Sequence, residues 1–588
     1  MSSYRAPVDE LLFLLFRVFN LEGHCQQLED INDVDEAMTS AILNEAAKLC
    51  EQVLAPLDAV GDSEGCQWSC DGVKAAAGFK DAYQKWCDTG CLALSGPESY
   101  GGMAMPKLLS AAVDEMLQGS NMALGLAPML TAGACLAIER HANEQLKQQY
   151  LSSMYSGRWA GAMDLTEAHA GSDLGLIRTL AEPQADGSFL ISGSKIFITW
   201  GEHDMAENII HLVLARLPGA PEGVAGISLF LLPKFLLNEN GGLGQRNHVS
   251  CGGIEHKMGI HASPTCLMNF DAAKAWMIGE PNKGLACMFS MMNYERLVVG
   301  VQALAVAEKS YQTAKAYAFE RQQGRAPVDS AIVVQSSSAK QTLLASRSPI
   351  AAHPDVKRMV LEMRCFNEAG RAFYLYVAKQ LDLWRYASAS DLREQAEKRV
   401  ALLTPVVKAF LSDRAFESCV LGQQVLGGHG YCRELGQEQR VRDVRITQIY
   451  EGTNGIQAVD LLQRRVVADS GVEFKNYSQE IRLAAEAAEP SIKQAVLELI
   501  DKLDVLTDYI CGESRAYLTA SSAVAFLDCV GYLSYAYMYI LMLKQSGDDQ
   551  RKARAHYYVA KLLPRVQALV VSIETGDQLL MELSTDAL

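Results

Sequence analysis

Apolar residues recur at three- and four-residue steps through most of the first 155 residues, which is the pattern of amphipathic helices. In the first such segment, 8–21, the residues that share one face are Leu11, Leu12, Leu15, Phe16 and Phe19. The other segments with this period are 35–53, 80–89, 106–118 and the stretch after Pro128. We therefore predict a helical N-terminal domain over 1–158, with a turn-rich excursion at 61–72.

At Trp159 the pattern changes to short runs of Val, Ile, Leu and Phe divided by Gly, Pro and Asp. The runs are 189–191, 195–199, 208–215 and 226–232. Short β-rich runs separated by turn signals predict a small antiparallel barrel or sandwich, here over 159–284. Strands do not alternate with helices, which excludes a doubly wound α/β sheet.

Helical periodicity returns after residue 284, where Met288, Met292, Val299 and Val306 form one stripe. Further long helices are predicted to begin near Pro354 and Leu403, so that 285–466 forms a four-helix-type bundle. Between the first two helices, 324–352 is rich in Ser, Gln and Ala and has no period, which predicts a surface insertion.

The last segment, 467–588, is predicted to be an extra helical domain, with its clearest apolar stripes at 496–506 and 553–573. It contains no cluster of acids, histidines or glycines. We therefore expect it to cover the bundle and to take part in subunit contacts rather than in chemistry.

Composition limits the classes of function. A chain of 588 residues exceeds a single hydrophobic core, and its net charge of −16 disfavours binding to nucleic acid. Scattered cysteines and an N-terminus unlike a signal peptide predict a cytoplasmic protein with free thiols. The Cys66/Cys70 and Cys87/Cys91 pairs lack the spacing of a zinc site, so no metal is expected.

The most apolar stretch, 525–543, carries Asp528 and several tyrosines. This composition fits a buried bundle helix better than a helix that faces lipid, so no transmembrane span is predicted. Peripheral contact with a membrane surface stays open.

The chemistry is predicted to centre on Glu451. This acid follows the apolar Ile449 and Tyr450 and precedes a Gly-Thr-Asn-Gly turn, so we expect it at a junction between elements, facing a cavity. Burial beside Tyr450 is expected to raise its pKa and strengthen it as a base. The alternative is a capping acid in an ordinary turn between helices.

The string Ile-Tyr-Glu-Gly-Thr-Asn-Gly-Ile-Gln at 449–457 resembles the acyl-CoA dehydrogenase family, whose catalytic base lies in a Tyr-Glu-Gly-Thr segment. The long form of the string and the extensions at both ends are similar to the branch that includes 3-methylmercaptopropionyl-CoA dehydrogenase. The resemblance runs from about Tyr4 to the end of the chain. It implies a helical N-domain, a β-barrel middle domain and a C-terminal bundle, followed here by the extra helical unit.

The resemblance also implies an activity. An FAD-dependent enzyme of this family desaturates an acyl-CoA thioester to a trans-2-enoyl-CoA, with the α-proton passing to Glu451 and the β-hydride to flavin N5. The implied substrate is of the fatty-acyl or methylthiopropanoyl type, and electron-transfer flavoprotein is the expected acceptor.

Segments 163–173 and 195–199 match those that flank the isoalloxazine ring of FAD in the family. The implied cofactor contacts here are Leu165, Thr166, Ser172, Phe197, Thr199 and Thr453. Phe197 also has an alternative role as an aromatic residue of a strand core. Ser172, Gly452 and Arg296 are the implied substrate contacts, and a structural salt bridge is the alternative role for Arg296.

A second glycine cluster, at 423–431, lacks the spacing and the preceding strand of a Rossmann fingerprint. It resembles the family's Gly-Gly-x-Gly element, in which Gln424, Gly427 and Gly428 would approach the adenosine half of FAD from a neighbouring subunit. Arg321 would reach the pyrophosphate, since a guanidinium fork suits phosphate oxygens, or would cap a helix end. A shared site implies a homo-oligomer, either a dimer or a tetramer.

Three positions depart from the family pattern. Ala168 stands where many members have proline, so this loop is expected to be less rigid. Trp200 is bulkier than the expected small residue and is predicted to narrow the acyl pocket. Pro354 stands where members often have a glutamine that contacts the flavin.

Three rival functions remain at this stage. An acyl-CoA oxidase would use the same groups and form peroxide in air. A flavin-containing, DNA-associated relative would show salt-dependent DNA binding. A noncatalytic helical scaffold would be colourless. If Glu451 were not the base, Glu295 would be the next candidate.

Overall fold

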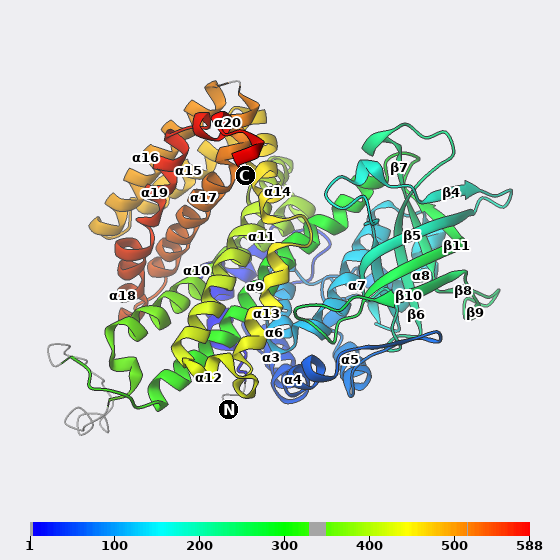
Figure 1. Cartoon of the computed structure of the whole chain (residues 1–588), viewed down its shortest axis with the longest axis horizontal. Helices are drawn as coiled ribbons and strands as arrows, with labels where there is room; N and C mark the ends of the chain where they lie inside the picture. The colour runs from blue at the N-terminus through cyan, green and yellow to red at the C-terminus, as the bar shows by residue number, and fades with distance from the viewer. Residues whose placement is uncertain (1–3, 328–347, 514, 588) are drawn as a thin grey trace. The chain divides into compact units, whose positions relative to one another are not determined.

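The computed structural model describes residues 4–327, 348–513 and 515–587. It shows a mainly helical chain whose main sheet comes from the middle of the sequence, as predicted (Figure 1). Two compact units can be separated. The helical unit comprises Met1–Arg5, Asp9–Asn20 and Val299–Leu588, and the mixed unit comprises Ala6–Val8 and Leu21–Val298. Of the predicted insertion at 324–352, residues 328–347 lie outside the described residues.

The mixed unit begins with helices. Their bounds are α2 Leu21–Cys25, α3 Glu36–Leu49, α4 Ala55–Glu64, α5 Phe79–Asp88, α6 Lys107–Ser120, α7 Met122–His141 and α8 Glu144–Tyr155. A π-helical segment, Cys50–Leu54, joins α3 to α4, so Pro56 lies in the first turn of a helix. Leu54 and Ala55 also have right-handed helical backbone, so Pro56 interrupts the hydrogen-bond ladder of a continuous helix directly after the π-helical segment.

The structure changes the bounds of two predicted segments in this region. The excursion at 61–72 is partly the end of α4 and partly a hairpin of β1 (Gln67–Ser69) and β2 (Gly72–Lys74). Helix α7 begins before Pro128, because the Asn121 side chain accepts a hydrogen bond from Leu124 N at 3.1 Å and caps the helix there.

The remaining strands are β3 Trp159–Asp164, β4 Leu180–Pro183, β5 Phe189–Thr199, β6 Asn208–Arg216, β7 Ile227–Pro233, β8 Phe235–Leu237, β9 Leu243–Arg246, β10 Val249–Ile254 and β11 Thr265–Ile278. Within the described residues, the main sheet has the order β10-β11-β5-β4-β6-β3, and β7 pairs with β11 and β6. Both β3 and β4 pair parallel with β6, which corrects the prediction of an antiparallel sheet. The long connections between these strands permit the parallel crossovers.

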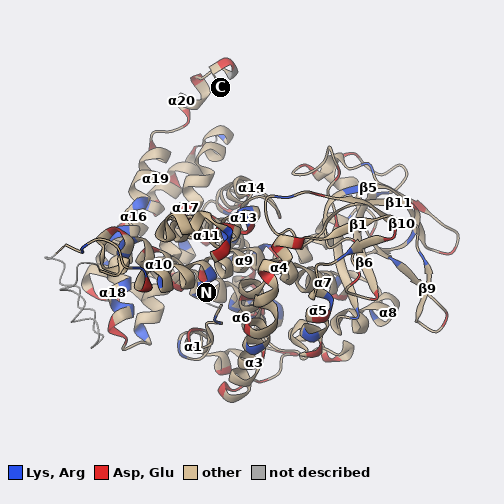
Figure 2. Cartoon of the chain, turned by 60° about the horizontal axis from the view of Figure 1, so that its bottom comes forward, with Lys and Arg blue, Asp and Glu red and all other residues tan. Residues whose placement is uncertain are grey.

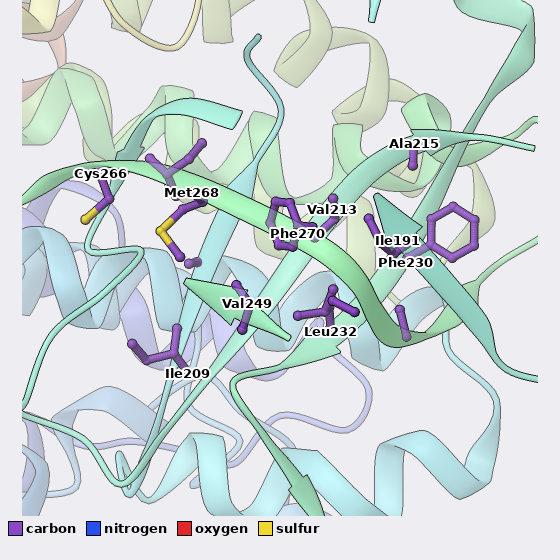
Figure 3. Close-up of a cluster of buried hydrophobic side chains, with 14 of the residues drawn as sticks. Ile191, Ile209, Val213, Ala215, Phe230, Leu232, Val249, Cys266, Met268 and Phe270 are labelled. Carbon is purple, nitrogen blue, oxygen red and sulfur yellow. The ribbon is translucent and has the colours of Figure 1, made fainter. Parts of the chain in front are cut away.

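The core of the sheet is an apolar cluster that includes Ile191, Val213, Phe230, Leu232 and Phe270 (Figure 3). Strands β6 and β7 are buried along almost their whole length, which explains their continuous apolar runs. Helix α7 packs against β3, the strand that leads directly into the first predicted cofactor segment.

In the helical unit, α1 (Val8–Leu12) and a π-helical segment, Phe13–Val18, precede the bundle helices. The bundle helices are α9 Gly284–Glu320, which starts in the mixed unit, α10 Pro354–Tyr386, α11 Ser390–Leu426, α12 Gly428–Tyr431, α13 Gln437–Arg445 and α14 Asn454–Val459. Helix α11 begins well before the predicted start at Leu403. Its first turns are mostly charged and exposed, so they carried no apolar signal.

The C-terminal helices are α15 Val472–Ala485, α16 Pro490–Gly512, α17 Ala516–Lys544, α18 Asp549–Tyr557, α19 Arg565–Glu574 and α20 Gln578–Glu582. The predicted stripe at 553–573 is divided between α18 and α19, with Pro564 immediately before α19. Helix α17 packs against α10, α11 and α14 (Figure 1).

Ion pairs join these helices to the bundle. Arg551 and Arg554 of α18 donate to the Glu368 carboxylate of α10, at 3.0 and 2.7 Å respectively. The basic residues of α18 are drawn in blue in Figure 2. Helices α15–α19 are thus built into the same compact unit as the bundle.

Among the described residues, α7 and α17 are long and apolar enough to cross a membrane. Most of the apolar window of each helix is buried inside the fold, 83% for α7 and 78% for α17. This burial is typical of core helices, as predicted for 525–543.

Candidate active site

Glu451 lies between a 3₁₀ turn, Ile446–Gln448, and α14, so its predicted place at a junction is confirmed. The residue is partly exposed and has a φ of +57°. Gly452 follows with a φ of +83°. Two consecutive residues therefore have left-handed backbone, which turns the chain sharply at the acid.

Side chains from two helices bind the backbone of this turn. The Glu451 carbonyl accepts a hydrogen bond from Gln457 Nε2 at 3.1 Å, and the Gly452 carbonyl accepts one from Lys408 Nζ at 2.7 Å. Lys408 is fully buried on α11 and also donates to Asn454 Oδ1 at 2.8 Å.

Asn454 connects the turn to α11. Its Nδ2 donates to Ser412 Oγ at 2.9 Å and to Asp413 Oδ1 at 2.8 Å. Gln448, on the other side of Glu451, donates to the same Asp413 oxygen at 2.5 Å. Asp413 therefore ties together the chain before and after the acid.

Tyr450 donates from its hydroxyl to Gln302 Oε1 on α9 at 2.5 Å. No motif in the sequence predicts a site role for Gln302, Lys408 or Asp413. Each stands alone on a long helix, where no local motif distinguishes it. Asn454 and Gln457, by contrast, lie within the string at 449–457 that had been singled out.

Thr453 is exposed, and its side chain accepts from Ile456 N at 3.4 Å, which places it at the N-cap of α14. The positive φ of Gly452 favours glycine, and a side chain there would meet Gln457 Nε2 at 2.6 Å and displace the amide that binds the Glu451 carbonyl. The cofactor role of Thr453 and the substrate role of Gly452 stay predictions.

In the mixed unit, a buried ion pair holds the first predicted cofactor segment. Glu167 Oε1 accepts from Lys195 Nζ at 2.9 Å and from the Thr179 hydroxyl at 2.6 Å. Lys195 also donates to the Leu165 carbonyl at 3.0 Å, and Ile196 N donates to the Thr166 carbonyl at 2.9 Å. The segments at 163–173 and 195–199 therefore lie side by side.

Electrostatics favour the charged form of Glu167. Burial raises the pKa of this carboxyl, but the Lys195 charge and the hydrogen bonds outweigh it and lower the pKa to about 2. Burial lowers the pKa of Lys195, and the Glu167 charge opposes that change. Lys195 of this pair fixes the backbone carbonyl of Leu165, and the backbone N–H of Ile196 fixes that of Thr166.

The turn at Ala168 is closed by two backbone hydrogen bonds between Glu167 and Ala170, both at 3.0 Å. Ordering of this loop therefore does not depend on a proline. Ser172, which follows, is exposed.

Trp200 is fully buried, and its Nε1 donates to the Ala123 carbonyl at 3.1 Å.

Phe197 has a φ of +60° and a side chain that is 58% exposed. It lies at an irregularity in the pairing of β5 with β11, where Ile198 pairs with Cys266 but Lys195 pairs with Met268. Such a bulge redirects a side chain, here out of the sheet, so the alternative role of Phe197 in the strand core was wrong. Thr199 is partly exposed at the end of the same strand.

Arg296 lies on α9 within the mixed unit, is 9% exposed, and stands over the Phe289 ring at 5.9 Å. Its neighbour Glu295 is fully buried. The Glu295 carboxylate lies so close to Gly133 of α7 that a Cβ there would meet it at 2.4 Å.

The second glycine cluster lies at the end of α11. Gly427, with a φ of +57°, separates α11 from α12, and nothing lies within 4 Å of where its side chain would be. The Tyr317 hydroxyl, on the last turn of α9, contacts His429 Nδ1 at 2.8 Å. The structure thereby brings Arg321, just beyond α9, to the same end of the bundle as the glycines.

These exposed groups are distant from Glu451 in the same unit. The Glu451 turn is bound by side chains from the part of α11 that runs from Lys408 to Asp413. Gly427 follows Asp413 about four helical turns later, which corresponds to about 20 Å along α11. The predicted site residues of this unit therefore form two groups at different positions along α11. One group is Glu451, Gly452 and Thr453, and the other is Arg321, Gln424, Gly427 and Gly428.

Comparison with known proteins identifies four matching domains. Residues 38–158 match the N-terminal domain of acyl-CoA dehydrogenase, 162–273 match its middle domain and 330–466 match its C-terminal domain. Residues 476–584 match the domain described as acetyl-CoA dehydrogenase C-terminal like.

Similar proteins extend over most of the chain. A 3-methylmercaptopropionyl-CoA dehydrogenase from Ruegeria pomeroyi is 43% identical over 82% of this chain and 79% of that protein. The broad-specificity linear acyl-CoA dehydrogenase FadE5 of Mycobacterium tuberculosis is 32% identical over the full length of both. An acyl-CoA dehydrogenase from Bacillus anthracis, solved with FAD, has a similar fold, with a TM-score of 0.74 at 21% identity over 95% of this chain and 92% of that one.

Proposed function

Because the chain belongs to the acyl-CoA dehydrogenase family of oxidoreductases, we propose that it is an FAD-dependent dehydrogenase that converts an acyl-CoA thioester to a trans-2-enoyl-CoA. The observation that carries the proposal is the Glu451 turn. A partly exposed carboxylate stands on left-handed backbone that buried side chains of α11 and α14 hold in place. Such a carboxylate can accept a proton at a defined point.

The residues predicted to contact FAD have properties that suit a flavin. Phe197 presents a large exposed ring that its backbone turns out of the sheet, and an apolar surface of this kind gains from being covered. The exposed Gly427 and Gly428 leave room for close approach to their backbone. Leu165, Thr166, Ser172 and Thr199 would hold the ring and phosphates, and bound FAD would supply the hydride acceptor.

Each protein group has a separate task in the proposed reaction. The Glu451 carboxylate takes the α-proton of the thioester while the β-hydrogen leaves as hydride. As enolate character develops, the Glu451 backbone N–H donates to the thioester oxygen. Arg296, Ser172 and Gly452 would position the substrate.

The substrate class rests on the similar proteins. One of them is named for a methylthiopropanoyl-type thioester and another for linear acyl-CoA, so we propose a fatty-acyl or methylthiopropanoyl substrate here. Electron-transfer flavoprotein is the proposed acceptor. A series of acyl-CoA thioesters of graded length, assayed by anaerobic bleaching of the flavin, would identify the preferred chain.

Glu451→Gln tests the proposal, because glutamine keeps the size of the side chain and removes the base. FAD should stay bound and acyl-CoA should still perturb its absorbance, while bleaching slows by about 10²–10⁴-fold or more. Glu451→Asp should retain part of the activity, since the shorter acid is misplaced by about one methylene.

Reduction of Glu451→Gln at the original rate would show that the base lies elsewhere, and Glu295→Gln would be examined next. Rapid peroxide formation by the unmodified enzyme in air, without an added acceptor, would instead assign it as an oxidase.

A further inference from the structure

Glu451 has a backbone conformation that a non-glycine residue rarely adopts, with a φ of +57°. A left-handed residue of this kind is strained and persists only where its surroundings determine it. The direction of the carboxylate depends on this backbone, because the Cα–Cβ bond turns with φ. Whatever stabilises the turn therefore sets where the acid points.

Two side chains bind the turn at successive carbonyl groups. Gln457 holds the carbonyl of Glu451 at 3.1 Å, and Lys408 holds that of Gly452 at 2.7 Å. Both side chains are fully buried. These contacts fix the orientation of the peptide planes on the C-terminal side of the acid.

Burial of an ammonium group such as that of Lys408 is strongly unfavourable unless the group is well paired. The second acceptor of Lys408, Asn454 Oδ1, belongs to the same turn, and Asn454 in turn donates to Ser412 and Asp413 of α11. Since α11 packs along α10 and α17, the lysine connects the turn to a rigid part of the unit.

We propose that Lys408 and Gln457 are positioning residues that hold Glu451 in its left-handed conformation, and so aim its carboxylate and its N–H at the substrate. This inference rests on the proposed function, in which Glu451 is the base. Neither side chain needs to touch substrate or FAD. Their contribution is to the rate of proton removal through the geometry of Glu451.

Lys408→Met tests the inference in the FAD-loaded enzyme. Methionine removes the donor and keeps the length of the side chain. A misplacement of about 1 Å can cost about 10²-fold in rate, so we expect flavin reduction by acyl-CoA to slow by about that factor. FAD content should change less than about twofold, and so should the substrate concentration that gives a half-maximal change in flavin absorbance. General damage to the fold would alter both quantities, so these two measurements separate damage from a loss of positioning.

The matched control is Lys398→Met on the same helix, where the lysine is exposed and pairs with Glu394. It should reduce at the original rate. Gln457→Met is the second test variant, and should slow reduction in the same way because it releases the Glu451 carbonyl. If Lys408→Met does not fold with FAD bound, the rate of flavin reduction in Gln457→Met tests the positioning role by itself.

A double variant separates positioning from a wider role. If Lys408 acts through the acid, then Lys408→Met should have little further effect on the slow residual reduction of Glu451→Gln. A further loss as large as in the parent enzyme would overturn the inference.

The two proposals fail in different ways. Unchanged reduction by Glu451→Gln would refute the proposed function itself. Strong loss in Glu451→Gln, with the original rate in both Lys408→Met and Gln457→Met, would refute only the positioning role. If Gln457→Met alone folds, its rate decides.

Discussion

Phe197 and Glu451 are both non-glycine residues with positive φ, +60° and +57°, and both had been singled out for function. For a bulky aromatic residue this conformation is a true outlier, and such strain is found at sites where a side chain must be presented. A bulge opposite β11 redirects Phe197, and side chains from α11 and α14 hold Glu451. At the residue scale, two of the predicted site residues have strained backbone, which a bulge stabilises at Phe197 and buried polar side chains stabilise at Glu451.

The buried pair of Lys195 and Glu167 supports a prediction about pH. Glu167 has a pKa of about 2 in the folded protein, below its ordinary value, so its stabilising effect is present above the ordinary pKa and is lost as pH falls toward 2. In Lys195→Met the carboxyl loses the charge that lowers its pKa. We therefore expect acid-induced release of FAD to begin at a higher pH in this variant than in the parent enzyme.

The measurement is flavin fluorescence during acid titration, and breaking this buried pair should also cost about 3–5 kcal/mol of stability at neutral pH. Lys274→Met, which removes a lysine paired with Asp186 on the surface of the same domain, is the control and should leave the titration unchanged. An identical acid midpoint in Lys195→Met would contradict the prediction.

At the scale of elements, α17 links the C-terminal helices to the bundle. It packs against α10, α11 and also α14, the short helix that begins directly after the Glu451 turn. The sequence analysis had assigned 467–588 to covering and subunit contact, not to chemistry. Because α17 packs against α14, loss of the C-terminal helices would destabilise the Glu451 turn as well as expose the bundle.

Gly531 permits the close approach of α17 to α11. A Cβ at this position would meet the Phe410 ring at 2.3 Å, so Gly531→Ala forces the helices apart. We expect a loss of about 1–3 kcal/mol in the free energy of unfolding, measured by denaturant titration with flavin and far-UV signals.

Gly512→Ala, at the end of α16 with nothing within 4 Å, is the matched control and should be neutral or slightly stabilising. Equal stability of the two variants would mean that α17 does not need this contact.

At the scale of the whole molecule, the proposed sharing of FAD between subunits would use the exposed end of the bundle. Arg321, Gln424 and the Gly427–Gly428 turn are exposed there, and Tyr431 is 83% exposed. These residues lie about 20 Å along α11 from the Glu451 turn. If FAD is shared between subunits, they would contact the adenosine half of another subunit's FAD. The proposed assembly is a homo-oligomer, dimer or tetramer, in the cytoplasm.

Arg321→Ala should therefore release FAD and weaken the assembly together, because one guanidinium would bind a phosphate group across a subunit boundary. Light scattering gives the mass of the particle and absorbance gives its FAD content. Lys552→Ala, at an exposed ion pair with Glu489 on α18, is the control for a lost surface charge. A colourless monomer from the unmodified chain after reconstitution would refute both the sharing and the assembly.

The arrangement of domains and the location of the acid could be predicted from the sequence. Helical and strand periods are local properties, and a Gly-Thr-Asn-Gly run locally disfavours a continuous helix. The junction at Glu451 and the start of the second long bundle helix at Pro354 were therefore predicted correctly. The early part of α11 was missed because its charged, solvent-exposed turns carry no apolar stripe.

Tertiary structure alone decided what holds the acid and how the sheet is paired. Lys408, Gln302 and Asp413 reach the turn from positions 38 to 149 residues distant in the sequence, and no local pattern encodes contacts of that kind. The parallel pairing of β3 and β4 with β6 likewise depends on crossovers through intervening chain. A sequence specifies such contacts only through the energy of the complete fold, in which burial makes each unpaired polar group costly and so selects its partner.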